Sequence, residues 1–111
     1  MLPTLNPRTA AIGLLFLGLV FSAGCSAPPG NPADGKRWYL MNNCSSCHGP
    51  HGNDGRAVNI AGIDMNFGSF VRKLRTTDAP IMPPFPEEKV SKQDAADIYA
   101  YLQSITPKTD Q

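Results

Sequence analysis

The sequence predicts a single small all-α domain in which two well-marked helices are separated by long irregular loops. The chain has 111 residues, a length that allows one domain, and no segment alternates β-branched and polar residues as a strand would. Glycines are frequent between residues 49 and 62, and prolines between residues 78 and 86. The formal net charge is +1, whereas a nucleic-acid-binding protein usually carries a basic excess.

The first helix is predicted to begin after Asn31 and to end near Asn43. Asn31 is a favourable N-cap, Pro32 suits the first helical position, and Asp34 lies in the first turn. A weaker helical pattern covers residues 69–75, whose apolar members are Phe70, Val71 and Leu74.

The last helix is predicted from a capping box and an apolar stripe. Ser91 is followed three residues later by Asp94, as in a capping box. Apolar residues then recur at helical spacing, at Ile98, Tyr101, Leu102 and Ile105. Pro107 lies just beyond the expected end.

Residues 1–24 are predicted to be a signal peptide. Arg8 and the amino terminus supply positive charge, residues 10–21 are apolar and uncharged, and residues 22–24 are small. The apolar run is shorter than the roughly 20 residues that a membrane-spanning helix needs. The alternative is an uncleaved anchor helix that extends to Gly24.

Cys25 follows this segment directly. The sequence Phe21-Ser22-Ala23-Gly24-Cys25 resembles the lipobox of bacterial lipoproteins, a resemblance that implies a lipidated Cys25 at the mature amino terminus. The alternatives are a free cysteine or a disulfide partner, but an odd cysteine in an exported protein needs an explanation. Several acyl chains together give stable anchoring.

These features divide the chain into four parts. They are a signal peptide (1–24), a lipidated cysteine with a Pro/Gly tether (25–31), a folded domain (32–105) and a C-terminal tail (106–111). Pro28 and Pro29 stiffen the tether, whose reach is about 20 Å at most. The protein is therefore expected to be exported, with the domain close to a membrane surface.

The chemistry is predicted from Cys44-Ser45-Ser46-Cys47-His48, because C-x-x-C-H is the attachment signature of c-type haem. Two thiols at this spacing can form thioethers with one haem, and the adjacent His48 can then give an imidazole nitrogen to the iron. Three alternatives remain: a Cys44–Cys47 disulfide, a zinc site that adds His51, and a thioredoxin-like redox pair, which needs a βαβ context.

Residues 31–105 resemble a class I c-type cytochrome. The matching features are a helix that enters the Cys44–Gly49 motif, the loop Gly52-Asn53-Asp54-Gly55, and Ile81-Met82-Pro83-Pro84-Phe85 ahead of a final helix. The resemblance implies a small class I cytochrome c fold, with the N- and C-terminal helices packed beside one covalently bound haem c. It also implies that Leu40 meets Tyr101 where these helices cross.

The sixth iron ligand is predicted to be Met82. Pro83 favours an extended backbone at Met82, neighbouring prolines stiffen the loop, and a rigid loop loses less entropy when sulfur binds. The Met-Pro pattern of the family also selects Met82. Met65 is the second candidate, whereas Met41 lies on the attached side; His51 and a vacant position are the remaining alternatives.

With His48 and Met82 both bound, the iron has no open position for a substrate, so single-electron transfer between redox proteins is expected. Apolar residues should exclude water from the iron: Trp38, Ile60, Ile63, Phe67, Phe70, Leu74, Ile81, Phe85, Ile98 and Tyr101. A His/Met pair and an apolar pocket both raise the reduction potential.

We further expect the lipid to attach the protein to a membrane, on its periplasmic or other extracytoplasmic side. Neither a nucleic acid nor a small-molecule substrate is expected as a partner. One alternative is the haem subunit of a larger oxidoreductase complex. Another, if the methionine is labile, is a protein that binds small ligands or reduces peroxide. Arg72, Lys73 and Arg75 are either a docking patch for an acidic partner or a solvated helix face.

Overall fold

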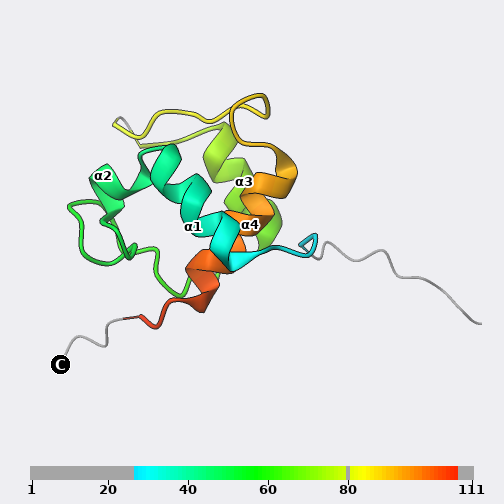
Figure 1. Ribbon diagram of the computed structural model, residues 1–111. Helices are drawn as coiled ribbons and strands as arrows, with labels where there is room; N and C mark the ends of the chain where they lie inside the picture. Colours follow the sequence, from blue (N-terminus) through cyan, green and yellow to red (C-terminus); the bar gives the residue numbers. More distant parts are fainter. Residues whose placement is uncertain (1–26, 80, 108–111) are drawn as a thin grey trace, which may run out of the picture.

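The computed structural model describes residues 27–79 and 81–107, which contain four helices and no strand. The all-α prediction is confirmed. The predicted signal peptide, Cys25 and the end of the tail lie outside the described residues. The helices, shown in Figure 1, are α1 (Pro32–Met41), α2 (Cys44–His48), α3 (Phe67–Arg75) and α4 (Lys92–Ser104).

Local capping signals place the two principal helices where the sequence predicts them. The Asn31 side chain accepts hydrogen bonds from the amides of Ala33 and Asp34, which begins α1. The predicted capping box of Ser91 and Asp94 forms in both directions at the start of α4. These local interactions fix where the two helices begin before any long-range packing is considered.

Two details differ from the prediction. The helix predicted over residues 69–75 begins two residues earlier, because Asn66 caps it by accepting from the Ser69 amide and Phe67 is buried. The motif cysteines form a separate short helix, α2, because Asn43 adopts a left-handed conformation with φ of 59° and ends the preceding turn.

α1 crosses α4 at very short range, and this crossing is the main helix–helix contact among the described residues. Gly35 makes the approach possible: a β-carbon at this position would collide with the Asp97 carbonyl of α4. One turn further along α1, Tyr39 packs edge-on against Tyr101, with ring centroids 5.6 Å apart. The expected partner, Leu40, is exposed, so the residue that meets Tyr101 at the crossing is Tyr39, one position before the predicted Leu40.

Aromatic and aliphatic side chains of all the longer helices form the core. Tyr39 and Leu102 are almost completely buried at the crossing, and Phe70 packs against Tyr99 where α3 meets α4. Within residues 27–79 and 81–107, no helix is sufficiently long and apolar to span a membrane.

Candidate functional site

A cavity of about 250 Å³ opens between the helices and the two long loops. Its walls are mostly apolar, and exposed side chains such as Val58 and Asp78 lie at its edge. The lining residues are Tyr39, Asn42, Cys44, His48, Val58, Ile60, Ile63, Met65, Phe70, Lys73, Leu74, Thr77, Asp78, Ala79, Met82, Phe85, Val90, Ile98 and Leu102.

Helix α2 brings the motif residues to this cavity. Cys47 and His48 follow Cys44 by three and four residues, so both lie near it around the helix. Cys44 and His48 line the cavity, whereas Cys47 is exposed. Both thiols are free, and burial, with a smaller effect from Cys47, raises the pKa of Cys44 to about 11. Cys44 and Cys47 form no disulfide with each other, so the structure does not support the first alternative.

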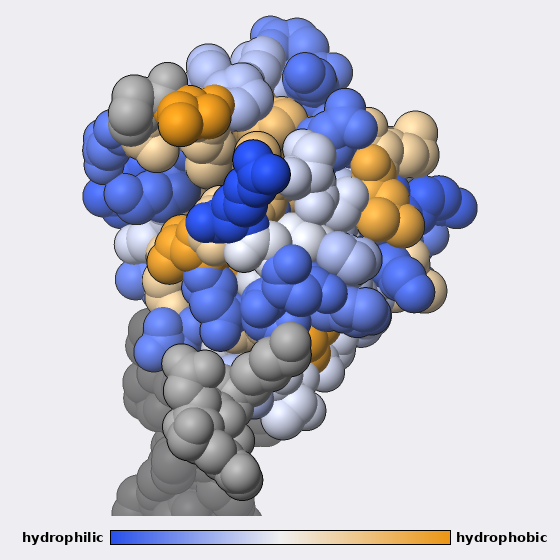
Figure 2. Space-filling model, turned by 90° about the vertical axis from the view of Figure 1, so that its left-hand side faces the viewer, coloured by the Kyte–Doolittle hydropathy of each residue, from blue (hydrophilic) through white to orange (hydrophobic). Residues whose placement is uncertain are grey.

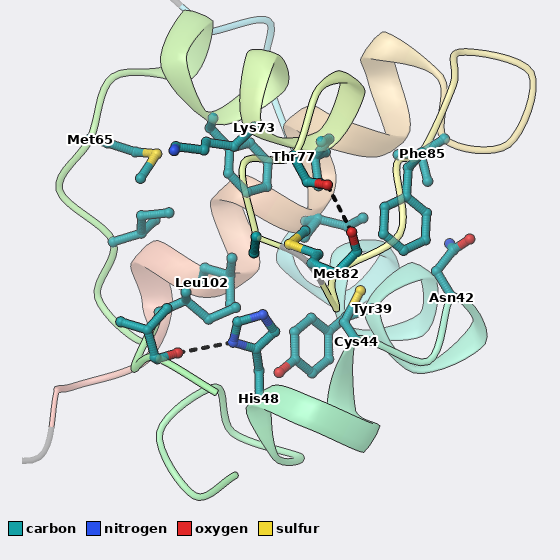
Figure 3. Close-up of a pocket in the computed structure, with 18 of the residues that line it drawn as sticks. Tyr39, Asn42, Cys44, His48, Met65, Lys73, Thr77, Met82, Phe85 and Leu102 are labelled. Carbon is teal, nitrogen blue, oxygen red and sulfur yellow. Dashed lines mark hydrogen bonds between the residues drawn. The ribbon is translucent and has the colours of Figure 1, made fainter. Parts of the chain in front are cut away.

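The His48 ring is held in an orientation that suits a metal ligand. Its Nδ1 lies 2.9 Å from the Val58 carbonyl oxygen, and since a carbonyl only accepts, Nδ1 carries the proton. The other nitrogen, Nε2, then has a free lone pair. In Figure 3 the labelled His48 ring points into the cavity. In most histidines that bind a metal, a hydrogen bond from the other ring nitrogen to a carbonyl or carboxylate fixes the tautomer and the orientation of the ring.

Met82 faces His48 across the cavity. Thr77 donates a hydrogen bond of 2.7 Å to the Met82 carbonyl, which holds the proline-flanked loop against the end of α3. In Figure 3 the Met82 side chain points toward the His48 ring from the opposite wall. This arrangement leaves a gap between a thioether and an imidazole that are both aimed inward.

Met65 also lines the cavity, and Figure 3 shows it entering beside Lys73. The Tyr99 hydroxyl donates a hydrogen bond of 2.7 Å to the Met65 carbonyl and fixes the backbone there. Met41, by contrast, is 64% exposed and is not a lining residue. The structure therefore brings two methionines to the cavity.

Two tyrosines at the α1–α4 crossing hold the loop that follows α2. The Tyr39 hydroxyl donates to the Gly49 carbonyl at 2.6 Å and the Tyr101 hydroxyl to the Pro50 carbonyl at 3.0 Å. Burial raises the pKa of both tyrosines. Gly49 has φ of 81°, a left-handed conformation that favours glycine, and lets the chain turn away from α2.

His51 lies outside the cavity. It is largely exposed, and its Nδ1 is 2.9 Å from Asp54 Oδ2. Hydrogen bonds from His51 lower the pKa of Asp54. No three His, Cys, Asp or Glu side chains gather as metal ligands within the described part of the chain, so the zinc alternative is not supported.

The basic residues at the end of α3 have separate roles. The Arg75 guanidinium donates to the carbonyls of Phe85 and Val90, at 2.8 and 2.7 Å. Lys73 pairs with Asp78 at 3.0 Å. Arg75 therefore ties the methionine-bearing loop to α3, a role that the sequence did not reveal, and is not part of a free docking patch.

Most of the predicted apolar wall is confirmed: Ile60, Ile63, Phe70, Leu74, Phe85 and Ile98 all line the cavity. Phe67 and Tyr101 are buried in the core instead, Trp38 packs beside the core, and Ile81 is 85% exposed. The prediction missed Tyr39, Val58, Val90 and Leu102. For Leu102, the available signal was its place in the apolar stripe of the last helix, beside the predicted Tyr101.

These residues fit a covalently bound haem. A tetrapyrrole needs an apolar slot, reduced thiols at its edge and axial donors aimed inward. The cavity supplies apolar walls, the free thiol of Cys44 and the unpaired Nε2 of His48.

The family model for "Cytochrome C oxidase, cbb3-type, subunit III" matches residues 30–102. The chain belongs to the cytochrome c family. A cytochrome c-555 of Methylococcus capsulatus is 31% identical over 109 residues, which cover 92% of this chain and 85% of that relative. No solved structure matches the chain significantly.

This cytochrome is accordingly a mono-haem electron carrier, with redox proteins as its partners. Its cofactor is covalently bound haem c, and Cys44 and Cys47 are its Cys-x-x-Cys pair. Bacterial cytochromes c are typically periplasmic. The α1–α4 packing agrees with the expected cytochrome c fold.

Proposed function

We propose that this protein is a lipid-anchored cytochrome that carries single electrons between respiratory redox partners. In this proposal Cys44 and Cys47 form the thioethers, and His48 and Met82 are the axial iron ligands. The observation that carries it is the facing pair of His48 and Met82 across an apolar cavity that Cys44 also lines. The haem supplies a reversible one-electron iron couple.

The surrounding residues prepare the site for transfer without rearrangement. The Val58 carbonyl orients His48, and the Thr77 hydroxyl restrains the Met82 backbone. These two hydrogen bonds would limit movement of the His48 ring and of the Met82 backbone during electron transfer. The apolar wall disfavours the extra charge of the ferric form, and the soft methionine sulfur favours the ferrous form.

The face on the α2 side of the molecule supports brief encounters with a partner. Figure 2 shows it as separate apolar patches interrupted by strongly polar groups. Electron-transfer complexes have small interfaces that are mixed in this way. Such a surface suits a partner that must dissociate after each electron.

Membrane attachment rests on the amino terminus. Residues 1–24 have the charge and apolar pattern of a signal peptide, and Cys25 ends a lipobox-like sequence. Acyl chains on Cys25 would hold the exported domain at the membrane surface.

A second candidate is the haem subunit of a larger oxidase complex. The match of residues 30–102 to a subunit III family of cbb3-type oxidases favours it. The cysteines and the axial ligands would have the same roles, but the protein would stay bound to its redox partner in the complex. Isolation in mild detergent distinguishes the two functions: a free carrier elutes alone, and a subunit elutes with an oxidase.

Mass spectrometry of the membrane-extracted protein tests the main proposal. We expect a mature chain that begins at Cys25 and carries the masses of both one haem and acyl chains. Cys25→Ser should release a soluble protein that is still red. A colourless Cys25→Ser protein, or a wild-type chain without acyl mass, would contradict the assigned roles of the three cysteines.

A further inference from the structure

The segment 27–31, which we call the strap, is bound to the outer surface of α4. The Asn31 amide donates to Asp97 Oδ1 at 2.9 Å, and Gln93 Nε2 donates to the Pro29 carbonyl at 2.9 Å. Gly30 lies so close to α4 that a β-carbon would collide with the Ala96 carbonyl. Ala27, at the far end of the strap, packs against the hydrophobic core.

The strap and the cavity lie on opposite faces of α4. The strap contacts Gln93, Ala96, Asp97 and Ala100, whereas Ile98 and Leu102 line the cavity. At about 100° per residue, the centres of these two sets lie roughly 170° apart around the helix. Figure 1 agrees: the strap leaves the domain on one side, and α2 lies on the other.

Little free chain remains between the strap and Cys25. Only Ser26 separates Cys25 from Ala27, and a connection of this length spans about 7 Å when fully extended. A flexible tether of all the residues 25–31 would have let the domain rotate freely. Because the strap is bound to the domain from Ala27 onward, it restricts this rotation.

We infer that the strap orients the domain on the membrane: the outer face of α4 is held toward the lipid headgroups, and the cavity opens toward the aqueous phase. The partner that this geometry fits is a redox protein approaching from the aqueous phase, not one buried in the bilayer. This inference rests on the proposed lipidation of Cys25.

Linear dichroism of haem absorbance in oriented bilayers tests the orientation, with the full-length, lipidated, haem-loaded protein. We expect a dichroic ratio clearly different from one. Inserting Gly-Ser-Gly-Ser between Ser26 and Ala27 should move the ratio to one, while hydrogen exchange at the Asn31 amide stays slow. Gly30→Val should abolish both the dichroism and the slow exchange. Gln103→Ala, an exposed glutamine on the same helix, is the matched control and should behave as wild type.

The direction of the cavity is tested by reduction with a soluble flavoprotein. Vesicle-bound wild type and soluble Cys25→Ser protein should react within about twofold of each other, because the opening stays accessible to a docking partner. The inference would be overturned by a dichroic ratio of one for the wild type or by an unchanged dichroic ratio after the insertion. A vesicle-bound reaction ten times slower than the soluble one would overturn it as well. Absence of acyl or haem mass would instead overturn the proposed function.

Discussion

Gly35→Ala should strongly destabilise the haem-loaded protein, because it obstructs the α1–α4 crossing. The added β-carbon would collide with the backbone carbonyl of Asp97, which cannot rotate away as a side-chain end can. Overpacking of this kind costs about 1–3 kcal/mol, and a backbone obstacle favours the upper end. Alanine recovers about 1 kcal/mol of helix propensity, so the net loss is about 2 kcal/mol.

Gly68→Ala is the matched control, since Gly68 is also helical but exposed. A β-carbon there meets only Asn66 Oδ1, at an ordinary contact distance of 3.5 Å. Because the position is near the start of α3, we expect a gain of about 0.5 kcal/mol. The two glycine-to-alanine changes should therefore alter the free energy of unfolding in opposite directions.

Thermal unfolding followed by far-ultraviolet circular dichroism measures both effects. In a domain of this size 1 kcal/mol shifts Tm by about 4–8 °C, so Gly35→Ala should lower Tm by about 8–16 °C and Gly68→Ala should raise it by about 2–4 °C. A Gly35→Ala protein as stable as wild type would refute the role of Gly35 at the crossing. Equal losses in both variants would mean that the helices tolerate no substitution, wherever the glycine lies.

Two further predictions concern the loops. Thr77→Val should make the Met82 ligand about fivefold easier to displace by added imidazole, because it removes one hydrogen bond of about 1 kcal/mol; Thr76→Val, whose hydroxyl bonds within α3, should leave displacement unchanged. In an NMR titration, the pKa of Asp54 should lie below its usual 3.8, and His51→Ala should raise it only part of the way back, because the backbone amide of residue 51 still donates to Asp54 Oδ1. Because the pKa of Asp54 is lower in the folded than in the unfolded protein, the contact stabilises the fold fully above the unfolded pKa of 3.8. This stabilisation is lost as the pH falls through the folded pKa. An unshifted pKa of Asp54 would contradict the contact.

The sequence predicted those features that local interactions determine. The caps at Asn31 and Ser91 act on amides two or three residues away, so the starts of α1 and α4 could be placed from neighbouring residues alone. The Cys44–His48 motif likewise carries its chemistry in adjacent residues.

Features that depend on distant backbone atoms left no trace in the sequence. The acceptors for His48 and Arg75 are carbonyls, which every residue possesses. Ile81 was misplaced because a proline-rich loop has no periodicity to distinguish an inward from an outward side chain. The Tyr39 contact was detectable: Gly35 and Tyr39 are four residues apart, so they share the face of α1 that meets α4.

The visible spectra of two methionine variants test the ligation of the iron most directly. Met82 and Met65 both line the cavity, so each is the control for the other. Wild type and Met65→Ala should be low-spin and keep the far-red methionine–iron band, whereas Met82→Ala should lose the band and bind carbon monoxide readily in the ferrous state. Loss of the band in Met65→Ala with retention in Met82→Ala would contradict the assignment of Met82 as the axial ligand.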